Sequence, residues 1–270
     1  MAKKKDDNIE MTLWDHLEEL RWVVIRSLGA VGILSIVAFI NKNIVFNRVF
    51  LAPKEPQFIT NQLLCKFSKY LNSDALCLNQ NGLDIINIKL AGQFTTHLYS
   101  SFAVGLFIAS PYIIFEFWRF VKPALHPKEK KHSRGAVLIS SFLFITGVLF
   151  GYFLIVPLTI NFLGGYHVSD AVSNTISLGS YLRNVVSVSL SLGVVFEIPV
   201  LVYFLTKTGL ITPQFMRKSR KIVLIILLIV SAIITPPDMI SQIMVCIPLL
   251  GLYELSIKIS QRVYNKNFAD

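Results

Sequence analysis

Six apolar runs divide this chain into segments that can cross a membrane and segments that connect them. A transmembrane helix needs about 20 predominantly apolar residues to cross the roughly 30 Å hydrocarbon core. Charged residues make up only 16% of the 270 residues, against about 25% in a soluble domain. The runs cover residues 22–40, 94–117, 135–156, 181–205, 222–234 and 240–257. We therefore predict an all-α integral membrane protein, with six transmembrane helices in a single membrane domain over residues 1–270.

The fifth and sixth runs are weaker than the others. The fifth holds 13 residues between Lys221 and Thr235, which reach only about 20 Å at 1.5 Å per residue. The sixth opens with the polar residues Ser241 and Gln242. We predict short fifth and sixth helices, matched by local thinning of the bilayer or by packing against protein. Length alone leaves open a single re-entrant hairpin over both runs.

The distribution of lysine and arginine predicts the orientation. The loops after the second and fourth runs are rich in basic residues, whereas loops 157–180 and 235–239 contain none. Basic loops stay in the cytoplasm, so both termini are predicted there, with a helix over residues 1–21 and a tail over 258–270. The outward loop 41–93 carries six basic residues, but long loops cross with little regard to charge. Topology explains most of the net charge of +10, so no nucleic-acid partner is expected.

Glu197 is the residue in the apolar runs that most strongly predicts a site. It lies inside LSLGVVFEIPVLVYFL, where an acid costs roughly 2.5–3.5 kcal/mol of insertion free energy. Two residues later, Pro199 has no amide hydrogen and leaves the carbonyl of Val195 without its helical partner. Such acids usually face a partner or water. A protonated Glu197 packed between helices is the structural alternative.

Two cytoplasmic segments carry further acids. Asp15 and Glu19 are four residues apart in TLWDHLEELRWVV, so a helix places both on one face without a local cation. A solvated amphipathic helix explains this pattern equally well. In the second loop, Glu129 stands among several lysines and arginines, which can simply neutralise it. Phe120 suits the aromatic belt at the membrane interface.

Three cysteines bear on the redox environment. Cys246 lies in the sixth run, whereas Cys65 and Cys77 both lie in the first outward loop. An oxidising compartment would let these two form a disulfide, worth about 3 kcal/mol for a loop of this length. We predict that bond. Two cysteines are too few for a zinc site, so no metal is expected.

Several motifs in order resemble the TatC family of twin-arginine protein translocases. They are HLEELR at 16–21, LAP at 51–53, FWRFVKPALHPKEKK at 117–131, FEIPV at 196–200 and TPPDMISQ at 235–242. The resemblance implies a bacterial inner-membrane protein that binds the Arg-Arg signal peptides of folded precursor proteins at its cytoplasmic face. It implies no catalytic residue and no cofactor. The implied partners are TatA and TatB, or one TatA-like subunit, in a hetero-oligomeric complex driven by the proton-motive force.

The resemblance also assigns roles to residues. Glu19 and Glu129 would receive the arginine pair, with Arg21 and Phe120 in the same surface. Glu197, Asp238 and Gln242 would be intramembrane polar positions where a single-span partner docks, with Glu197 on a concave, partly hydrated face. From the residues alone, Asp238 is better explained as the N-cap of the sixth helix. Pro53 matches a structural position of the first outward loop. Residues 54–90 are longer than in many relatives, so no role is carried onto them.

Two other classes of function are less well supported. A proton-coupled secondary transporter could use Glu197 as its titrating group, but the two halves show no repeated pair of interrupted helices, and the acidic face at Asp15 and Glu19 would have no role. An intramembrane protease lacks its motifs, because the chain contains neither GxSG nor HExxH. The chain also has no GxxxxGK[ST] loop, so it is not expected to hydrolyse a nucleotide.

Overall fold

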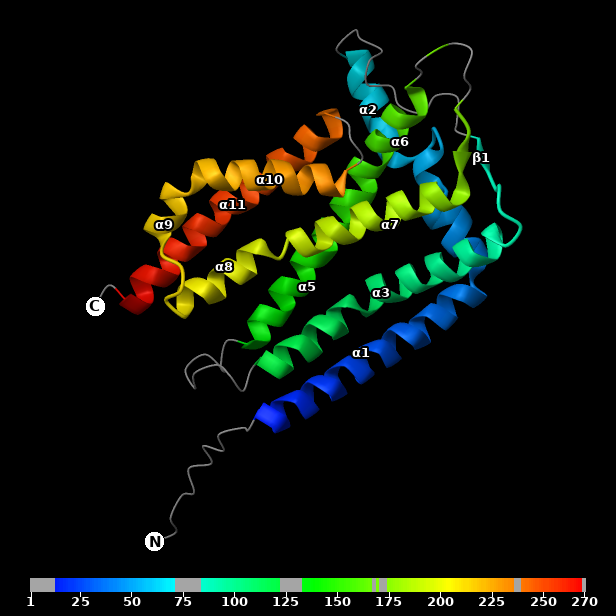
Figure 1. The fold of residues 1–270 in the computed structure, drawn as a ribbon. Helices are drawn as coiled ribbons and strands as arrows, with labels where there is room; N and C mark the ends of the chain where they lie inside the picture. Colours follow the sequence, from blue (N-terminus) through cyan, green and yellow to red (C-terminus); the bar gives the residue numbers. More distant parts are fainter. Residues whose placement is uncertain are drawn as a thin grey trace.

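Helices make up nearly all of the protein, as the apolar runs predict (Figure 1). The computed structural model describes residues 13–70, 84–121, 133–166, 169, 174–235 and 239–268. The helices are α1 (Leu13–Ile40), η1 (Ile44–Phe50), η2 (Ala52–Lys54), α2 (Ile59–Tyr70), α3 (Gly92–Val121), α5 (Ser133–Phe150), η4 (Gly151–Ile155), α6 (Val156–Gly165), α7 (Leu178–Val195), α8 (Ile198–Lys207), α9 (Pro213–Lys218), α10 (Arg220–Ile234) and α11 (Met239–Phe268). The sheet structure of the described chain is one parallel pair, β1 (Ile85–Ile86) with β2 (Ile176–Ser177), in which Ile85 is opposite Ile176.

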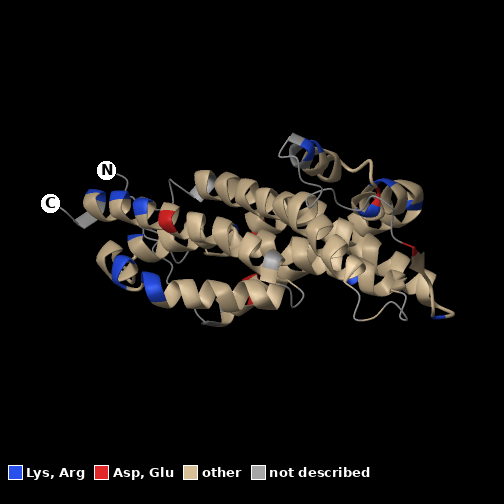
Figure 2. Cartoon of the chain, turned by 90° about the horizontal axis from the view of Figure 1, so that it is seen from above, with Lys and Arg blue, Asp and Glu red and all other residues tan. Residues whose placement is uncertain are grey.

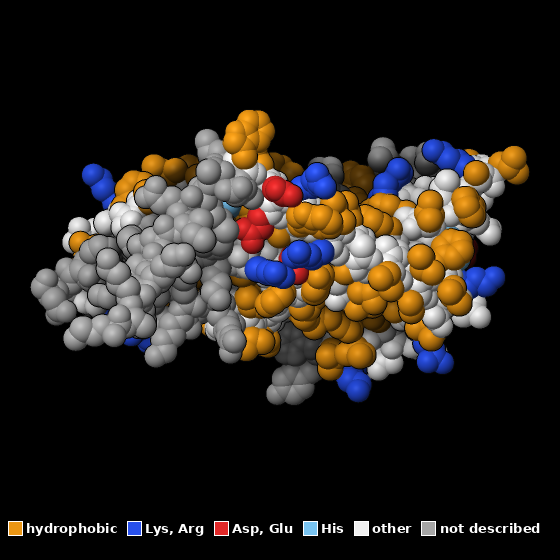
Figure 3. Space-filling model, turned by 90° about the horizontal axis from the view of Figure 1, so that it is seen from below, with side chains coloured by type: hydrophobic (Ala, Val, Ile, Leu, Met, Phe, Trp, Pro, Cys, Tyr) orange, Lys and Arg blue, Asp and Glu red, His pale blue; other side chains and the backbone are white. Residues whose placement is uncertain are grey.

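Five helical stretches in the described chain are long and apolar enough to cross a bilayer. They cover His16–Ile40, Gly92–Val121, Gly135–Gly165, Leu178–Lys207 and Ser241–Lys266. Hydrophobic side chains cover much of the described part of the face seen in Figure 3, as contact with lipid requires. The predicted all-α membrane fold is confirmed, and so is the short fifth helix, since α10 has only 15 residues.

The predicted short sixth helix is wrong, because α11 has 30 residues and extends beyond its apolar run. α11 continues from the predicted end at Ile257 to Phe268. Its polar continuation is tied to neighbouring elements, because the Ser260 and Thr206 hydroxyls are 2.8 Å apart and Arg217 donates to Gln261 at 3.0 Å. Hydropathy marks where a helix meets lipid, whereas these contacts determine where the helix ends.

The start of α1 and the end of α11 lie at the same end of the helix bundle, as the predicted orientation requires (Figure 1). Lysine and arginine residues gather at that end, and others lie on the segment at the opposite end (Figure 2). The outward segment 41–93 contains helices η1, η2 and α2 and strand β1, so its described part is a folded cap rather than an irregular loop.

The third membrane helix continues beyond its predicted end at Val156. It passes through the π-helix η4 into α6 and ends at Gly165. Pro157 cannot donate to the Phe153 carbonyl four residues earlier, but the Thr60 hydroxyl of α2 donates to that carbonyl instead. A side chain of the cap therefore provides the hydrogen bond that Pro157 cannot give to the Phe153 carbonyl, and the helix continues.

The fourth membrane helix is broken at the predicted position. α7 ends at Val195, residues 196–197 form a turn, and α8 begins at Ile198. The Glu197 amide bonds to the Val194 carbonyl at 3.1 Å, a tighter turn than the helical pattern. The second half then restarts with Pro199 in its first turn, where a missing amide hydrogen costs little.

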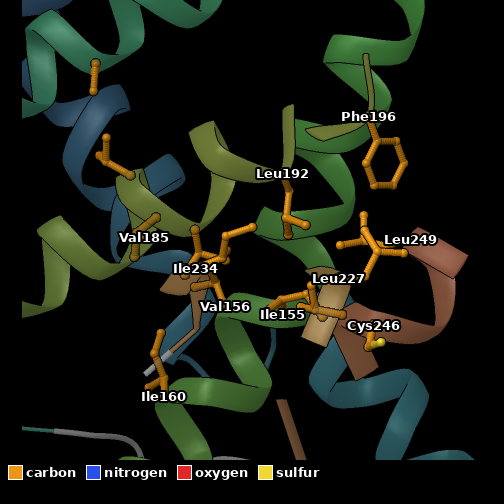
Figure 4. Close-up of a cluster of buried hydrophobic side chains, with 14 of the residues drawn as sticks. Ile155, Val156, Ile160, Val185, Leu192, Phe196, Leu227, Ile234, Cys246 and Leu249 are labelled. Atoms are coloured by element: carbon orange, nitrogen blue, oxygen red, sulfur yellow. The ribbon is translucent and has the colours of Figure 1, made fainter. Parts of the chain in front are cut away.

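The core lies where the third, fourth, fifth and sixth membrane helices meet (Figure 4). Ile155, Leu192 and Leu249 point into it from three of these helices, and each is completely buried. Leu227 of the short α10 joins the same cluster. The short fifth helix is therefore held by packing against protein, one of the two ways in which a short span can be accommodated.

Glycine allows α5 and α7 to approach closely. A Cβ atom on Gly147 would lie 2.6 Å from the Leu192 carbonyl oxygen and 2.9 Å from the Cα of Gly193. Small residues at such crossings let helix backbones touch, which stabilises helix pairs in membranes.

We expect Gly147→Ala to destabilise the protein by about 2 kcal/mol, because overpacking a close contact typically costs 1–3 kcal/mol. The matched control is Gly32→Ala in α1, where nothing lies within 4 Å of the added methyl group and alanine is the better helix former. Thermal unfolding of the two purified variants in detergent measures the difference. Equal midpoints would show that the α5–α7 crossing tolerates a larger residue.

Candidate functional site

The cytoplasmic ends of α1 and α3 bring two of the predicted recognition residues to one surface. The rings of His16 and Phe120 stack with centroids 4.2 Å apart and planes 19° apart. Glu19 lies three residues after His16, which places it on the same face of α1. Its Oε2 atom is buried and has no hydrogen-bond partner within the described chain. A buried carboxylate oxygen left unpaired is costly, so this one is well suited to receive a cationic donor.

Arg21 lies close in sequence but points elsewhere. It is exposed, and its guanidinium carbon lies 5.7 Å from the centre of the Trp22 ring. The structure therefore does not show Arg21 in contact with Glu19 or Phe120. Glu129 lies outside the described residues, as does the side chain of Asp15, so the predicted Glu19–Glu129 pairing stays a prediction.

An ion cluster next to this surface was not predicted. Glu116 of α3 is only 2% exposed and pairs with Arg26 of α1 at 3.3 Å and with Arg119 at 3.7 Å. The Tyr112 hydroxyl donates to the same carboxylate at 3.1 Å. Glu116 therefore fastens α1 to α3 one helical turn before Phe120.

A local signal for this cluster exists in the sequence. Arg26 lies four residues inside the first apolar run, and a charged residue there needs a partner. The sequence does not name that partner, because Glu116 is 90 residues away along the chain.

Glu197 lies at the break between α7 and α8, ten residues before the end of α8 at Lys207. That distance corresponds to about 15 Å, near the middle of the hydrocarbon core. The carboxyl group is within hydrogen-bonding reach of the Ser140 hydroxyl of α5, while its Oε1 atom is buried without a partner in the described residues. The Trp118 indole nitrogen of α3 donates to Ser140 at 3.4 Å, so three membrane helices meet at this acid.

Gln242 does not join Glu197. Its amide donates to the Leu228 carbonyl of α10 at 3.1 Å, which ties α11 to the short fifth helix. The contact between Thr206 and Ser260 aligns the parallel helices α8 and α11. On that alignment Gln242 lies about nine residues, or roughly 13 Å, further outward than Glu197. Asp238 lies outside the described residues.

Beside Glu197 is an apolar hollow of about 470 Å³ between α5, α8 and α11. Pro199, Val200 and Tyr203 line it from α8, and Leu143 and Leu255 line it from the neighbouring helices. The combination of a half-buried acid with an adjacent apolar hollow suits an apolar helix that carries one polar side chain.

Two residues with predicted structural roles, Pro53 and Cys65, lie in different helices of the outward cap. Pro53 is buried in η2, and its carbonyl accepts from Asn61 of α2 at 3.2 Å. Cys65 of α2 is disulfide-bonded. Its predicted partner Cys77 lies outside the described residues, so the pairing stays a prediction.

The fold and these sites define a class: a multi-pass α-helical membrane protein with a buried, unpartnered carboxylate oxygen of Glu19 near the start of α1 and the carboxyl group of Glu197 inside the bilayer. The chain belongs to the TatC family, because the family model described as Sec-independent protein translocase protein (TatC) matches residues 15–248. It is therefore a multi-pass protein of the bacterial inner membrane and a subunit of the Sec-independent protein translocase.

Individual relatives agree with this assignment over nearly the whole chain. The chain is 40% identical to the Sec-independent protein translocase protein TatC of Blattabacterium sp. subsp. Periplaneta americana (strain BPLAN), over 97% of this chain and 99% of the relative. It is 36% identical to the TatC protein of Aquifex aeolicus (strain VF5), over 92% and 93% of the two chains. A crystal structure described as Twin Arginine Translocase Receptor TatC matches with a TM-score of 0.67 and 32% identity, over 92% of this chain and 99% of that one.

Proposed function

We propose that this chain is the receptor subunit that binds Arg-Arg signal peptides of folded precursor proteins at its cytoplasmic face. The observation that carries the proposal is the buried Oε2 atom of Glu19, which has no partner within the described chain. It lies beside the stacked rings of His16 and Phe120. A guanidinium group can satisfy a carboxylate with two parallel hydrogen bonds, and its planar face can lie against an aromatic ring.

This arrangement favours arginine over lysine. An ammonium group is a compact, strongly hydrated point charge that cannot reproduce the bidentate geometry. Glu129 is the second acid of the proposed site and would receive the other arginine. The apolar part of the signal peptide would lie along a groove between membrane helices. Binding of this kind requires no covalent chemistry.

We also propose that Glu197 is the docking point for a single-span partner, TatA, TatB or a TatA-like subunit. The support is its unpartnered Oε1 atom and the apolar hollow beside Pro199. Gln242 would contribute indirectly, because its hydrogen bond to the Leu228 carbonyl holds α10 against α11, one of the helices that line the hollow. The complex would use the proton-motive force for export.

Photo-crosslinking of a signal peptide to the purified protein tests the receptor proposal. We expect an Arg-Arg peptide to label the chain, and a Lys-Lys peptide to label it much less. Glu19→Ala should weaken binding of the Arg-Arg peptide roughly tenfold or more, because a charge-assisted hydrogen bond contributes about 1.5–3 kcal/mol. Glu129→Ala should have a similar effect.

The matched control is Glu18→Ala, an exposed acid on the neighbouring face of the same helix, which should leave labelling nearly unchanged. If all three variants label like the unmodified chain, the receptor proposal is wrong. If Glu18→Ala weakens labelling as much as Glu19→Ala, general negative charge is responsible instead of a defined site.

A further inference from the structure

A polar hollow of about 340 Å³ lies at the outward ends of α3 and α7, away from the proposed receptor surface. Lys89 lines it from the segment before α3, and Arg183 lines it from α7. Thr95, Thr96 and Tyr99 contribute hydroxyl groups from α3. The proposed function uses none of these residues.

The hollow is positively charged. Neither Lys89 nor Arg183 has a carboxylate partner among the described residues, and no acid of the described chain lines the hollow. Arg183 lies near the outward end of a membrane-spanning stretch, 24 residues before its last residue Lys207. That distance is about 36 Å, beyond the roughly 30 Å hydrocarbon core and at the level of the lipid head groups. These two cationic side chains, without carboxylate partners, would therefore attract an anion into the hollow.

The start of α7 strengthens the preference for an anion. Thr95 and Thr96 donate their hydroxyl hydrogens to backbone carbonyls of their own helix, so they offer no donor to an occupant. Leu178 and Gly179, the first residues of α7, also line the hollow. Amides at these positions have no partner within a helix and carry the positive end of its dipole. The hollow is thus lined by two cations and a helix N-terminus.

Exposed apolar side chains lie at this hollow and next to it in the chain. Ile88 lines the hollow and is 73% exposed, and Leu90 and Phe94, close to it in sequence, are 106% and 64% exposed. Large exposed apolar groups next to a transmembrane helix lie against lipid. An occupant that fits both environments has an anionic head and a hydrocarbon tail.

We propose that this hollow binds the phosphate group of an anionic phospholipid in the outward leaflet of the membrane. The phosphate would be held between the Arg183 guanidinium and the Lys89 ammonium, with the α7 amides beside it. The acyl chains would run along the exposed apolar face of α3. Basic pockets between transmembrane helices bind lipid head groups in this way. A free phosphate ion has the same charged group, but it has no hydrocarbon part that could contact the exposed apolar side chains.

Native mass spectrometry of the purified full-length chain tests the proposal. The protein is delipidated in detergent and titrated with phosphatidylglycerol, phosphatidylcholine or inorganic phosphate. We expect phosphatidylglycerol to bind at least tenfold more tightly than phosphatidylcholine, and inorganic phosphate not to displace it. The variant Arg183→Gln with Lys89→Gln should lose most of this preference. Its matched control is Arg262→Gln with Lys266→Gln, which removes two exposed cations from the cytoplasmic end of α11.

Three outcomes would overturn the proposal. The first is equal affinity of the unmodified chain for the two lipids, which decides the matter even if the double variant fails to fold. The second is unchanged phosphatidylglycerol affinity in the Arg183 and Lys89 variant. The third is displacement of the lipid by inorganic phosphate, which would make the occupant a soluble anion. Signal-peptide labelling is measured separately, so failure here leaves the proposed function standing.

Discussion

Glu116→Gln should destabilise the protein by about 2 kcal/mol. Breaking a buried ion pair typically costs 3–5 kcal/mol because it leaves an unpaired charge. The cost here is lower, since the Arg26 and Arg119 side chains are 39% and 53% exposed and water screens them. Glutamine keeps the size of the side chain and its bond to Tyr112, so the measured loss reports the charge. The measurement is denaturation of the purified protein in detergent.

A double-mutant cycle with Arg26→Gln isolates the contact between α1 and α3. We expect the double variant to be more stable than the sum of the single effects allows, with a coupling energy of about 1 kcal/mol. Glu254→Gln is the matched control. It breaks a shorter pair, 2.9 Å to Arg220, in which both side chains are about half exposed, and should cost less than about 1 kcal/mol. Equal losses of unfolding free energy in Glu116→Gln and Glu254→Gln would mean that burial does not strengthen the Glu116 ion pairs.

The Glu116→Gln variant also tests whether the ion cluster supports the proposed receptor surface. Glu116 lies one helical turn before Phe120, which stacks on His16. Loss of the ion cluster should therefore loosen the position of Phe120 relative to α1 and weaken signal-peptide labelling in Glu116→Gln. Arg119 cannot compensate, because it lies on the same helix as Glu116 and does not join α3 to α1.

Glu197→Leu should reduce export roughly tenfold or more, whereas Glu197→Gln should keep most of it. A polar side chain hydrogen-bonded between membrane helices contributes about 1–2 kcal/mol, which corresponds to about a tenfold change in an equilibrium. Glutamine can still hydrogen-bond to Ser140 and to a polar group of a docked helix, whereas leucine cannot. Export of a reporter precursor into the periplasm measures the effect. Val194→Leu, an exposed apolar change three residues earlier, is the matched control.

The set of variants at Glu197 separates the two functions weighed for this acid. If glutamine fails as badly as leucine, the charge or its titration is required, and the proton-coupled transporter gains support. If leucine supports full export, the acid has no function in transport. Loss of export in Val194→Leu as well would show that the turn tolerates no change, and stability would then have to be measured before export is interpreted.

The helix break at Glu197 was predictable from sequence because its cause is local. Pro199 removes one backbone donor, and the carbonyl it abandons is four residues away in the same segment. The structure indeed ends α7 at Val195. The predicted end of the third membrane helix at Val156 was wrong, because the helix continues through Pro157 to Gly165. The Thr60 hydroxyl, which donates to the Phe153 carbonyl there, lies 93 residues earlier in the chain.

The candidate site was partly predictable for the same reason. Glu19 and Phe120 stood out through their motifs, and the structure brings Phe120 against the helix that carries Glu19. Glu116 was missed because its meaning depends on Arg26, which only the packing of α1 on α3 brings within 3.3 Å. The docking role of Gln242 stays a prediction. The structure adds that its amide donates to the Leu228 carbonyl of α10, a contact between two helices that the sequence does not show.

The sequence by itself determined the all-α membrane fold, the short fifth helix and the broken fourth one. Each of these follows from hydropathy or a missing amide hydrogen within one segment, and lipid makes such local costs decisive. Only the tertiary structure decided where α6 and α11 end, which residues hold Glu116, and that Lys89 and Arg183 face one hollow. Those features depend on side chains that are distant in the chain and become neighbours only when the helices pack.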